Sequence, residues 1–185
     1  MLASHSYDPG FQNCSPELKK VLSGSTNIPG GNSLDLPCGT GRNIFLLASH
    51  FKKVVGVDIN QEYLNIIETN CHKYSFPGSS ILTKKMDLMT EIPLDIEDFD
   101  FISTIHYYTH SLATRIIHHM KKGGLFYLET PSCAGGNYHD LPSEQEVASL
   151  VKDTEVILYK SRICQSPDSS TKSISFKILV RKPNG

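Results

Sequence analysis

Short apolar runs and amphipathic stretches alternate along most of the chain. Runs rich in Val, Ile, Leu and Phe predict seven strands, the first beginning at Ser33 and the others covering 53–58, 80–86, 99–105, 125–130, 155–163 and 173–181. Between several of them, apolar positions recur every three or four residues, which predicts helices over 44–51, 60–71, 109–122 and from 143 onward. This alternation is typical of an α/β fold with a largely parallel sheet.

The patterns also predict which faces are buried and how the chain ends. The run 99–105 is almost continuously apolar, as in a central strand that is buried on both faces. The predicted helix 60–71 places Tyr63, Leu64, Ile67 and Cys71 on one face. Only a short polar segment separates the last two strands, so these strands are expected to be antiparallel neighbours.

Two segments carry little regular pattern. Residues 1–32 are polar and contain Pro and Gly breakers, so only Pro16–Leu22 predicts a short helix there. The main domain is therefore expected at 33–185, with the first 32 residues as a tail that packs on the edge of the sheet. The segment 87–94 is short and interrupted by Pro93, so no long helix is expected between the third and fourth strands.

Charge and cysteine content exclude several classes of protein. At 185 residues the chain is the size of one domain. Lys and Arg number 18 against 19 Asp and Glu, so DNA is not an expected partner and RNA is disfavoured. The five cysteines form no CxxC pair, which favours reduced thiols and a cytoplasmic location. No apolar run approaches the ~18 residues of a membrane span, and His118 and His119 lack a third ligand at metal spacing, so no metal site is expected.

A glycine turn follows the first predicted strand and leads into the first helix of the main domain. Gly39 and Gly41 let the backbone approach a ligand closely, and the N–H groups at the helix start favour an anionic group. Asp58 ends the second strand 17 residues after Gly41, where a carboxylate can accept hydrogen bonds from a ribose diol. Ile44 stands where a dinucleotide fingerprint needs its third glycine. The expected ligand is therefore a nucleoside with an anionic tail, and a nicotinamide dinucleotide is disfavoured.

The turn resembles the first motif of the class I S-adenosylmethionine-dependent methyltransferases. Residues 34–43 read Leu-Asp-Leu-Pro-Cys-Gly-Thr-Gly-Arg-Asn, which is especially similar to a group of small enzymes that includes the tellurite-resistance type. The resemblance extends from about Ser33 to about Arg181, and its main departure is Pro37 in place of the first glycine. It implies a doubly wound, Rossmann-like sheet of seven strands, mostly parallel with an antiparallel C-terminal hairpin strand. It also implies S-adenosylmethionine as the cofactor and offers a second interpretation of 1–32, as a lid over the pocket.

The resemblance further implies which residues hold the cofactor. Asp35 would lie near the amino group of the methionine part, Asp58 at the ribose and Ile59 against the adenine ring. The complete predicted set is Asp35, Pro37, Cys38, Gly39, Gly41, Arg42, Asn43, Asp58, Ile59, Asp87, Leu88, Thr104 and Ile105. Three of these residues have an alternative structural role: Asp35, Asp58 and Asp87 can each cap backbone N–H groups of a turn or helix.

A cluster of aromatic and polar side chains follows the fourth strand, where the resemblance puts the transferred methyl group. His106 is predicted to accept a proton from a hydroxyl, thiol or amine nucleophile, and Tyr107 to stabilise a sulfonium by cation–π attraction of about 0.5–2 kcal/mol. The alternative is that the tyrosines pack at a helix start and the histidine is solvated. Glu129 and the loop 137–140 either line the acceptor pocket or form a connector.

These features predict a methyltransferase acting on a small-molecule acceptor by in-line displacement. The alternatives are a protein that binds S-adenosylmethionine without turnover, and an enzyme acting on protein or RNA. No Asn/Asp-Pro-Pro-Tyr string follows the fourth strand, where 104–107 read Thr-Ile-His-Tyr, so an amino-directed nucleic acid enzyme is disfavoured.

Overall fold

The architecture was obtained from a computed structural model, which describes residues 14–24, 28, 30–73, 78–92, 95–130, 141–165 and 172–184. One sheet of seven strands, in the order β3-β2-β1-β4-β5-β7-β6, forms its centre. The first five strands are parallel: β1 (Asn32–Asp35), β2 (Lys53–Asp58), β3 (Ser80–Lys85), β4 (Phe101–Ile105) and β5 (Leu125–Glu129). The predicted doubly wound, Rossmann-like fold class is confirmed.

The C-terminal hairpin is also confirmed. β6 (Glu155–Gln165) and β7 (Lys172–Arg181) are antiparallel, and β7 inserts between β5 and β6. Lys177 of β7 is thereby paired in register with Glu129 at the end of β5. The final strand of the chain therefore carries side chains to the same edge of the sheet as the glycine turn.

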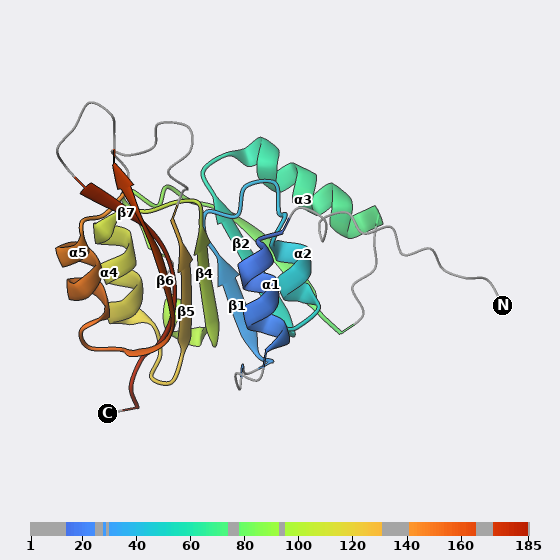
Figure 1. The fold of residues 1–185 in the computed structure, drawn as a ribbon. Coiled ribbons are helices and arrows are strands. Elements are labelled where there is room, and N and C mark those ends of the chain that lie inside the picture. The colour runs from blue at the N-terminus through green and yellow to red at the C-terminus, as the bar shows by residue number, and fades with distance from the viewer. Residues whose placement is uncertain are drawn as a thin grey trace.

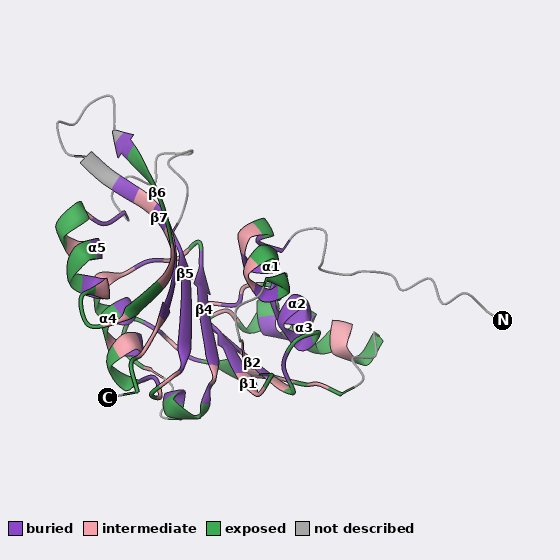
Figure 2. Cartoon of the chain, turned by 60° about the horizontal axis from the view of Figure 1, so that its bottom comes forward, coloured by how far each residue is buried: buried purple, intermediate pink, exposed green. Residues whose placement is uncertain are grey.

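Helices cover both faces of the sheet (Figure 1). One face carries α1 (Pro16–Ser23), α2 (Ile44–Ala48) and α3 (Gln61–Lys73), and the other carries α4 (His110–His119) and α5 (Glu144–Val151). Each face has its own apolar cluster, one containing Phe101 and Tyr127, the other Ile102 and Phe126. Figure 2 shows that the central strands β4 and β5 are buried, as the apolar run 99–105 predicts.

The helix after the glycine turn is shorter and more buried than its sequence predicts. The pattern predicts one apolar face over 44–51, but α2 ends at Ala48 and all five of its residues are buried. The reason is α1, whose Leu18 and Leu22 belong to the same apolar cluster as α2. α1 thus lies beside α2 on the same face of the sheet, with Ser15 and Glu17 in contact with β5 and β6.

The predicted N-terminal helix is present and firmly attached. Ser15 caps α1 by accepting a hydrogen bond from the Leu18 N–H, and Glu17 pairs with Lys160 of β6 at 2.7 Å. Residues 1–13 lie outside the described residues. The interpretation of residues 1–32 as a lid stays a prediction.

The remaining elements agree with the predictions made from the sequence, with small differences in where they begin and end. Between β3 and β4, the described residues contain only the short 3-10 helix η1 (Ile96–Asp98). α4 ends at His119 rather than at Lys122, because Met120 leaves the helical conformation before the turn at Gly123. α5 begins with the full capping box of Ser143 and Glu146.

The thiol state and the lengths of the helices bear on where the protein acts. Cys164 is disulfide-bonded, so the expectation of reduced thiols is wrong at this position. Linear spacing could not reveal this pair, because folding decides which sulfur atoms meet. The cytoplasmic location loses that support and stays a prediction. In the described part of the chain, no helix is both long and apolar enough to span a membrane.

Candidate functional site

The glycine turn after β1 is shaped by backbone hydrogen bonds to the neighbouring strands. The Leu36 N–H donates to the Ser103 carbonyl at 2.9 Å, and the Cys38 N–H donates to the Val57 carbonyl at 2.8 Å. Gly39 and Gly41 have φ values of 54° and 88°, in the left-handed region that favours glycine. The Leu36–Pro37 peptide is cis. The turn is therefore fixed directly over the carboxyl ends of β1, β2 and β4.

Asp58 joins the end of β2 to this turn. One oxygen of its carboxylate accepts from the Gly39 N–H at 2.8 Å, and the other accepts from the Asn60 N–H at 2.9 Å. The side chain thus has the capping role that was its structural alternative. Each carboxylate oxygen has two lone pairs, so the residue still has acceptor capacity toward a ligand.

The turn and Asp58 line one common cavity of about 360 Å³. Seven residues of the predicted cofactor set line it, namely Pro37, Cys38, Gly39, Arg42, Asn43, Asp58 and Ile105. Its volume is within the range of small-molecule sites, about 300–1,000 Å³. The glycine turn, which would bind the anionic tail of a nucleoside, and Asp58, which would bind its ribose, therefore line the same cavity.

Two lining residues were not predicted as part of the site. Thr40 lies inside the glycine turn, between the predicted glycines. Tyr63 was expected on the buried face of the second helix with Leu64 and Ile67, but its side chain is 41% exposed and lines the cavity. Its position one turn after Asp58 was the available signal, since the start of a helix that follows a strand end lies beside the crevice.

Asp35 lies beneath the turn and has an unusual electrostatic environment. It is 1% exposed, and one carboxylate oxygen accepts from the Ser103 hydroxyl at 2.6 Å. The other oxygen, Oδ2, is buried and has no hydrogen-bond partner among the residues that the structure describes. Burial raises the pKa of Asp35 from 3.8 to about 7, and the Ser103 hydrogen bond and the Arg42 charge only partly oppose this. A cationic group near Oδ2 would favour the ionised form.

The Cys38 thiol is an unsuitable nucleophile. It is 5% exposed, and burial, together with the nearby Asp35 and Asp58 carboxylates, raises the pKa of its thiol. The group therefore stays neutral at physiological pH, which agrees with its predicted place as a wall of the cofactor pocket rather than a covalent catalyst.

The other predicted cofactor residues lie outside the cavity lining. Gly41 packs against Ile67, and Ile59 is 58% exposed at the end of β2. Leu88 is buried in the apolar cluster under α4, and Asp87 accepts from the Met89 N–H at 2.9 Å, the capping role that was its alternative. Thr104 packs against residues of α4, because its side chain faces the opposite side of the sheet from that of Ile105.

The two predicted catalytic residues follow β4 directly. His106 has a φ of 59°, rare for a residue with a side chain. Its Nδ1 lies 2.7 Å from Nη2 of Arg42, and its Nε2 lies 3.5 Å from Oε1 of Glu129. The Tyr107 hydroxyl donates to the sulfur of Met89 at 3.2 Å, and burial together with the Asp87 charge raises the pKa of Tyr107. The His106 side chain is 48% exposed and Tyr107 packs in part against the apolar cluster under α4, so the alternative interpretation stands beside the catalytic one, which stays a prediction.

Glu129 is the centre of a buried polar cluster that the sequence does not reveal. Its carboxylate accepts from the Ser15 hydroxyl at 2.6 Å and the Tyr127 hydroxyl at 2.8 Å, and pairs with Lys177 at 2.8 Å. Burial opposes its charge, but these donors and His106 outweigh burial and hold the pKa of Glu129 well below its usual value. Ser15 also donates its backbone N–H to Asn43 of the glycine turn at 3.0 Å. The loop 137–140 lies outside the described residues.

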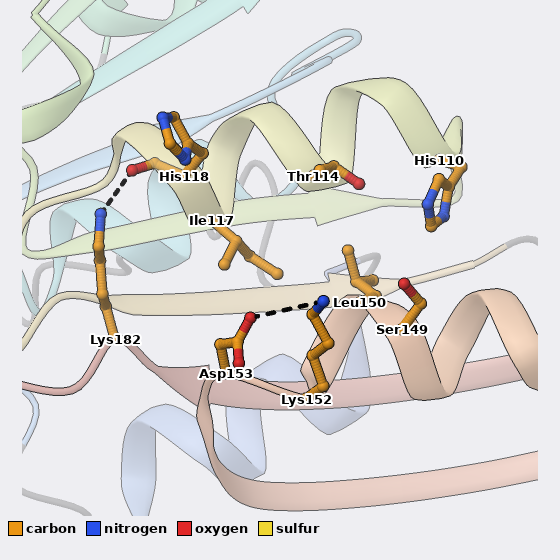
Figure 3. Close-up of a pocket in the computed structure, with 9 residues that line it drawn as sticks. All are labelled: His110, Thr114, Ile117, His118, Ser149, Leu150, Lys152, Asp153 and Lys182. Carbon is orange, nitrogen blue, oxygen red and sulfur yellow. Dashed lines mark hydrogen bonds and ion pairs between the residues drawn. The ribbon is translucent and has the colours of Figure 1, made fainter.

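A second cavity, of about 460 Å³, lies between α4 and α5 (Figure 3). Its lysines serve the fold: Lys182 donates to the carbonyl oxygen atoms of His118 and Met120, and Lys152 pairs with Asp153 at 3.9 Å. No group of three or more metal-ligating side chains occurs among the described residues. The cavity over the glycine turn therefore remains the candidate site.

Comparison with known proteins identifies the class. Residues 34–124 match the model of a methyltransferase domain family. No curated protein matches the chain by sequence. Residues 34–124 are therefore a methyltransferase domain, and the predicted class of S-adenosylmethionine-dependent methyltransferases with the class I fold is confirmed.

Solved structures share this fold at low sequence identity. An S-adenosylmethionine-dependent methyltransferase from Methanosarcina mazei is 20% identical, with 83% of this chain and 93% of that chain covered and a TM-score of 0.61. TehB from Haemophilus influenzae is 22% identical, with 82% and 57% covered and a TM-score of 0.60. The [4+2]-cyclase SpnF is 14% identical, with 91% and 81% covered and a TM-score of 0.68.

Proposed function

We propose that the protein transfers the methyl group of S-adenosylmethionine to a small-molecule acceptor by in-line displacement. The observation that carries the proposal is the single cavity shared by the glycine turn and Asp58, with the partnerless Oδ2 of Asp35 beneath it. When bound, S-adenosylmethionine supplies a sulfonium methyl group that a nucleophile can displace.

The residues present fit this cofactor. A cation beside Asp35 would provide the partner that its buried oxygen lacks, and the amino group of the methionine part is such a cation. Apart from the chain neighbours of Gly39, no atom of the described residues lies within 4 Å of the position that a Cβ on Gly39 would take, so the ligand can approach the backbone there. The free lone pairs of Asp58 suit ribose hydroxyls.

The remaining predicted residues would surround these two anchors. We place Pro37, Cys38, Asn43 and Ile105 along the bound cofactor, since they line the cavity. Further residues near the strand ends would lie at the adenine, by the family resemblance, namely Ile59, Asp87 and the Leu88 backbone. Holding the nucleophile in line with the methyl group and sulfur supplies most of the rate enhancement, because alignment removes an entropic barrier of about 7–11 kcal/mol.

The acceptor would lie beside His106 and Tyr107. His106 would take the proton of the nucleophile, and the face of Tyr107 would favour the positive charge at sulfur. A small acceptor is favoured over nucleic acid because the chain has 18 Lys and Arg against 19 Asp and Glu.

A second candidate function is binding of S-adenosylmethionine without methyl transfer. It is favoured by the likeness in fold to SpnF, which is named for a [4+2] cyclisation rather than a methylation. Fold alone does not decide between these functions. Turnover must therefore be measured separately from binding.

Calorimetry tests the binding half of the proposal. We expect S-adenosylmethionine and S-adenosylhomocysteine to bind and NADH not to bind. Binding of NADH alone would contradict the assigned class. A panel of thiols, phenols, amines and tellurite, assayed for S-adenosylhomocysteine release, then distinguishes methyl transfer from binding without turnover.

Changing Asp58 tests its place in the site. We expect Asp58→Ala to weaken S-adenosylhomocysteine binding by about 1–3 kcal/mol, because ribose hydroxyls would lose a buried acceptor. Asp58 also shapes the turn through the Gly39 N–H, so thermal unfolding of Asp58→Ala and of Asp58→Asn, which keeps one acceptor oxygen, should be measured in parallel. Asp153→Ala, at a side chain that is 83% exposed, is the control. Equal affinity of Asp58→Ala and the control would remove Asp58 from the site.

A further inference from the structure

His106 is held in a defined position at the end of β4. Its backbone N–H donates to the carbonyl oxygen of Glu129 at 2.7 Å, and its φ of 59° turns the chain away from the strand. A left-handed conformation is strained for a residue with a Cβ and persists only where surrounding contacts enforce it. The side chain therefore projects from a backbone that neighbouring strands fix.

The contacts of the imidazole ring define which nitrogen carries the proton. A guanidinium group only donates hydrogen bonds, so Nδ1, 2.7 Å from Nη2 of Arg42, must be the acceptor nitrogen. The proton of the neutral ring is then on Nε2, which faces Oε1 of Glu129 at 3.5 Å. The ring thus lies between a cation on its Nδ1 side and an anion on its Nε2 side.

Glu129 is suited to fix this arrangement because it is a buried and stationary anion. It is 4% exposed, and three elements besides its own strand bring groups to it: Ser15 before α1, His106 after β4 and Lys177 in β7. Tyr127 of the same strand adds a fourth donor. A carboxylate held by this many donors keeps both its charge and its orientation.

We propose that Glu129 is a positioning residue that holds His106 with its proton on Nε2, so that Nδ1 is the proton acceptor of the site, and that Arg42 covers Nδ1 until a carboxylate binds the guanidinium. The inference rests on the proposed function. Arg42 lines the cofactor cavity, and a carboxylate in that cavity would compete for its guanidinium through two parallel hydrogen bonds.

His106 Nδ1 takes the proton of the acceptor hydroxyl, thiol or amine while the lone pair of that atom forms the new bond to the methyl carbon. The electrons of the broken sulfur–methyl bond stay on sulfur, which becomes neutral. The imidazolium so formed lies beside the Glu129 carboxylate, which compensates its charge.

Nitrogen-15 NMR of histidine-labelled protein tests the positioning role without any acceptor. His106→Asn identifies the His106 signals by their loss. We expect the Nε2–H form in the wild type and in Arg42→Met, where Glu129 alone fixes it. This preference should be lost when Glu129→Leu, whose side chain accepts no hydrogen bond, is combined with Arg42→Met, and should recover when Glu129→Asp takes the place of Glu129→Leu. Tyr127→Phe is the matched control, because it removes one donor but keeps the carboxylate. An Nδ1–H form in the wild type or in Arg42→Met, or an unchanged Nε2–H preference in the double variant, would overturn the proposal.

Two further measurements test whether the Arg42 guanidinium occupies Nδ1 of His106. Arg42→Met should shift the Nδ1 signal in the absence of ligand. This variant also keeps the proposal testable if the Glu129 substitution prevents folding. S-adenosylhomocysteine should cause a similar shift in the wild type, whereas methylthioadenosine, which lacks the amino-acid tail, should not. An unchanged Nδ1 signal in Arg42→Met would refute the proposal that Arg42 occupies Nδ1.

The outcome of this test is separable from that of the proposed function. If S-adenosylhomocysteine does not bind at all, the proposed function fails. The form of His106 in the free protein still decides whether Glu129 positions it, and the Arg42→Met spectrum still decides whether Arg42 covers Nδ1.

Discussion

Replacing Asp35 by asparagine should make the protein more stable above neutral pH and, at the same time, weaker in binding its cofactor. Asp35 is 1% exposed and its pKa is raised from 3.8 to about 7, chiefly by burial. Each pKa unit corresponds to about 1.4 kcal/mol, so this shift of about three units makes ionisation of the folded protein cost about 4 kcal/mol more than ionisation of the unfolded chain.

The direction of the pH dependence follows from proton counting. Between about pH 4 and pH 7, the folded protein keeps a proton on Asp35 that the unfolded chain has released. The free energy of unfolding of the wild type therefore falls as pH rises through this window. Asparagine carries no charge, so Asp35→Asn lacks this fall. Its Nδ2 is left without a partner in place of Oδ2, which offsets part of the gain.

Urea denaturation of both proteins at a series of pH values measures the effect. We expect the difference in unfolding free energy, Asp35→Asn minus wild type, to increase by up to about 4 kcal/mol between pH 4 and pH 8. Ser103→Ala, which removes the one donor to Asp35, should show the opposite behaviour and lose more stability at pH 8 than at pH 4. A difference that is flat with pH, or a variant less stable than the wild type at pH 8, would refute the reasoning. Calorimetry should show weaker S-adenosylhomocysteine binding by Asp35→Asn, by about 1–3 kcal/mol.

Two further predictions concern the turn and a helix end. Gly41→Ala should lower the unfolding free energy by about 2–4 kcal/mol, because its φ is 88° and a Cβ there would lie 2.6 Å from Ile67. A Cβ on Gly39 would meet no atom of the described residues within 4 Å, so Gly39→Ala should lower the unfolding free energy by only about 1–2 kcal/mol. It should nevertheless weaken S-adenosylhomocysteine binding. Equal loss of stability in the two variants would contradict this reasoning. Ser143→Ala should lower the thermal midpoint through a loss of about 0.5–2 kcal/mol, since it removes the cap of α5, whereas Ser149→Ala on the exposed face of that helix should not.

Much of the fold could be predicted because local chemistry determines it. Apolar runs fixed the strands, the short link between the last two strands required them to be antiparallel, and the Ser143 and Glu146 pair marked the start of α5. The glycine turn and Asp58 were identified as one site because the carboxyl ends of parallel strands meet at one edge of a sheet. These arguments need only residues that are close together in sequence or joined by strand geometry.

The remaining features depend on contacts between distant segments. Nothing in the sequence of α2 shows that α1 packs in the same apolar cluster, and nothing near Glu129 shows that Ser15 and Lys177 meet there. Thr104 illustrates a different limit. Successive side chains of a strand point to opposite faces, but a strand buried on both faces carries no polar alternation to mark which face Thr104 takes.

The insertion of β7 has a consequence for how the protein is made. β6 is synthesised before β7 but touches β5 only through it, and Lys177, the cation that pairs with Glu129, lies near the end of the chain. A nascent polypeptide on the ribosome therefore cannot close its sheet, or neutralise this carboxylate, until the last strand has emerged. Domains fold as units, so a product that ends before β7 would lack the strand that joins β5 to β6 and should be recognised by cellular quality control as unfinished.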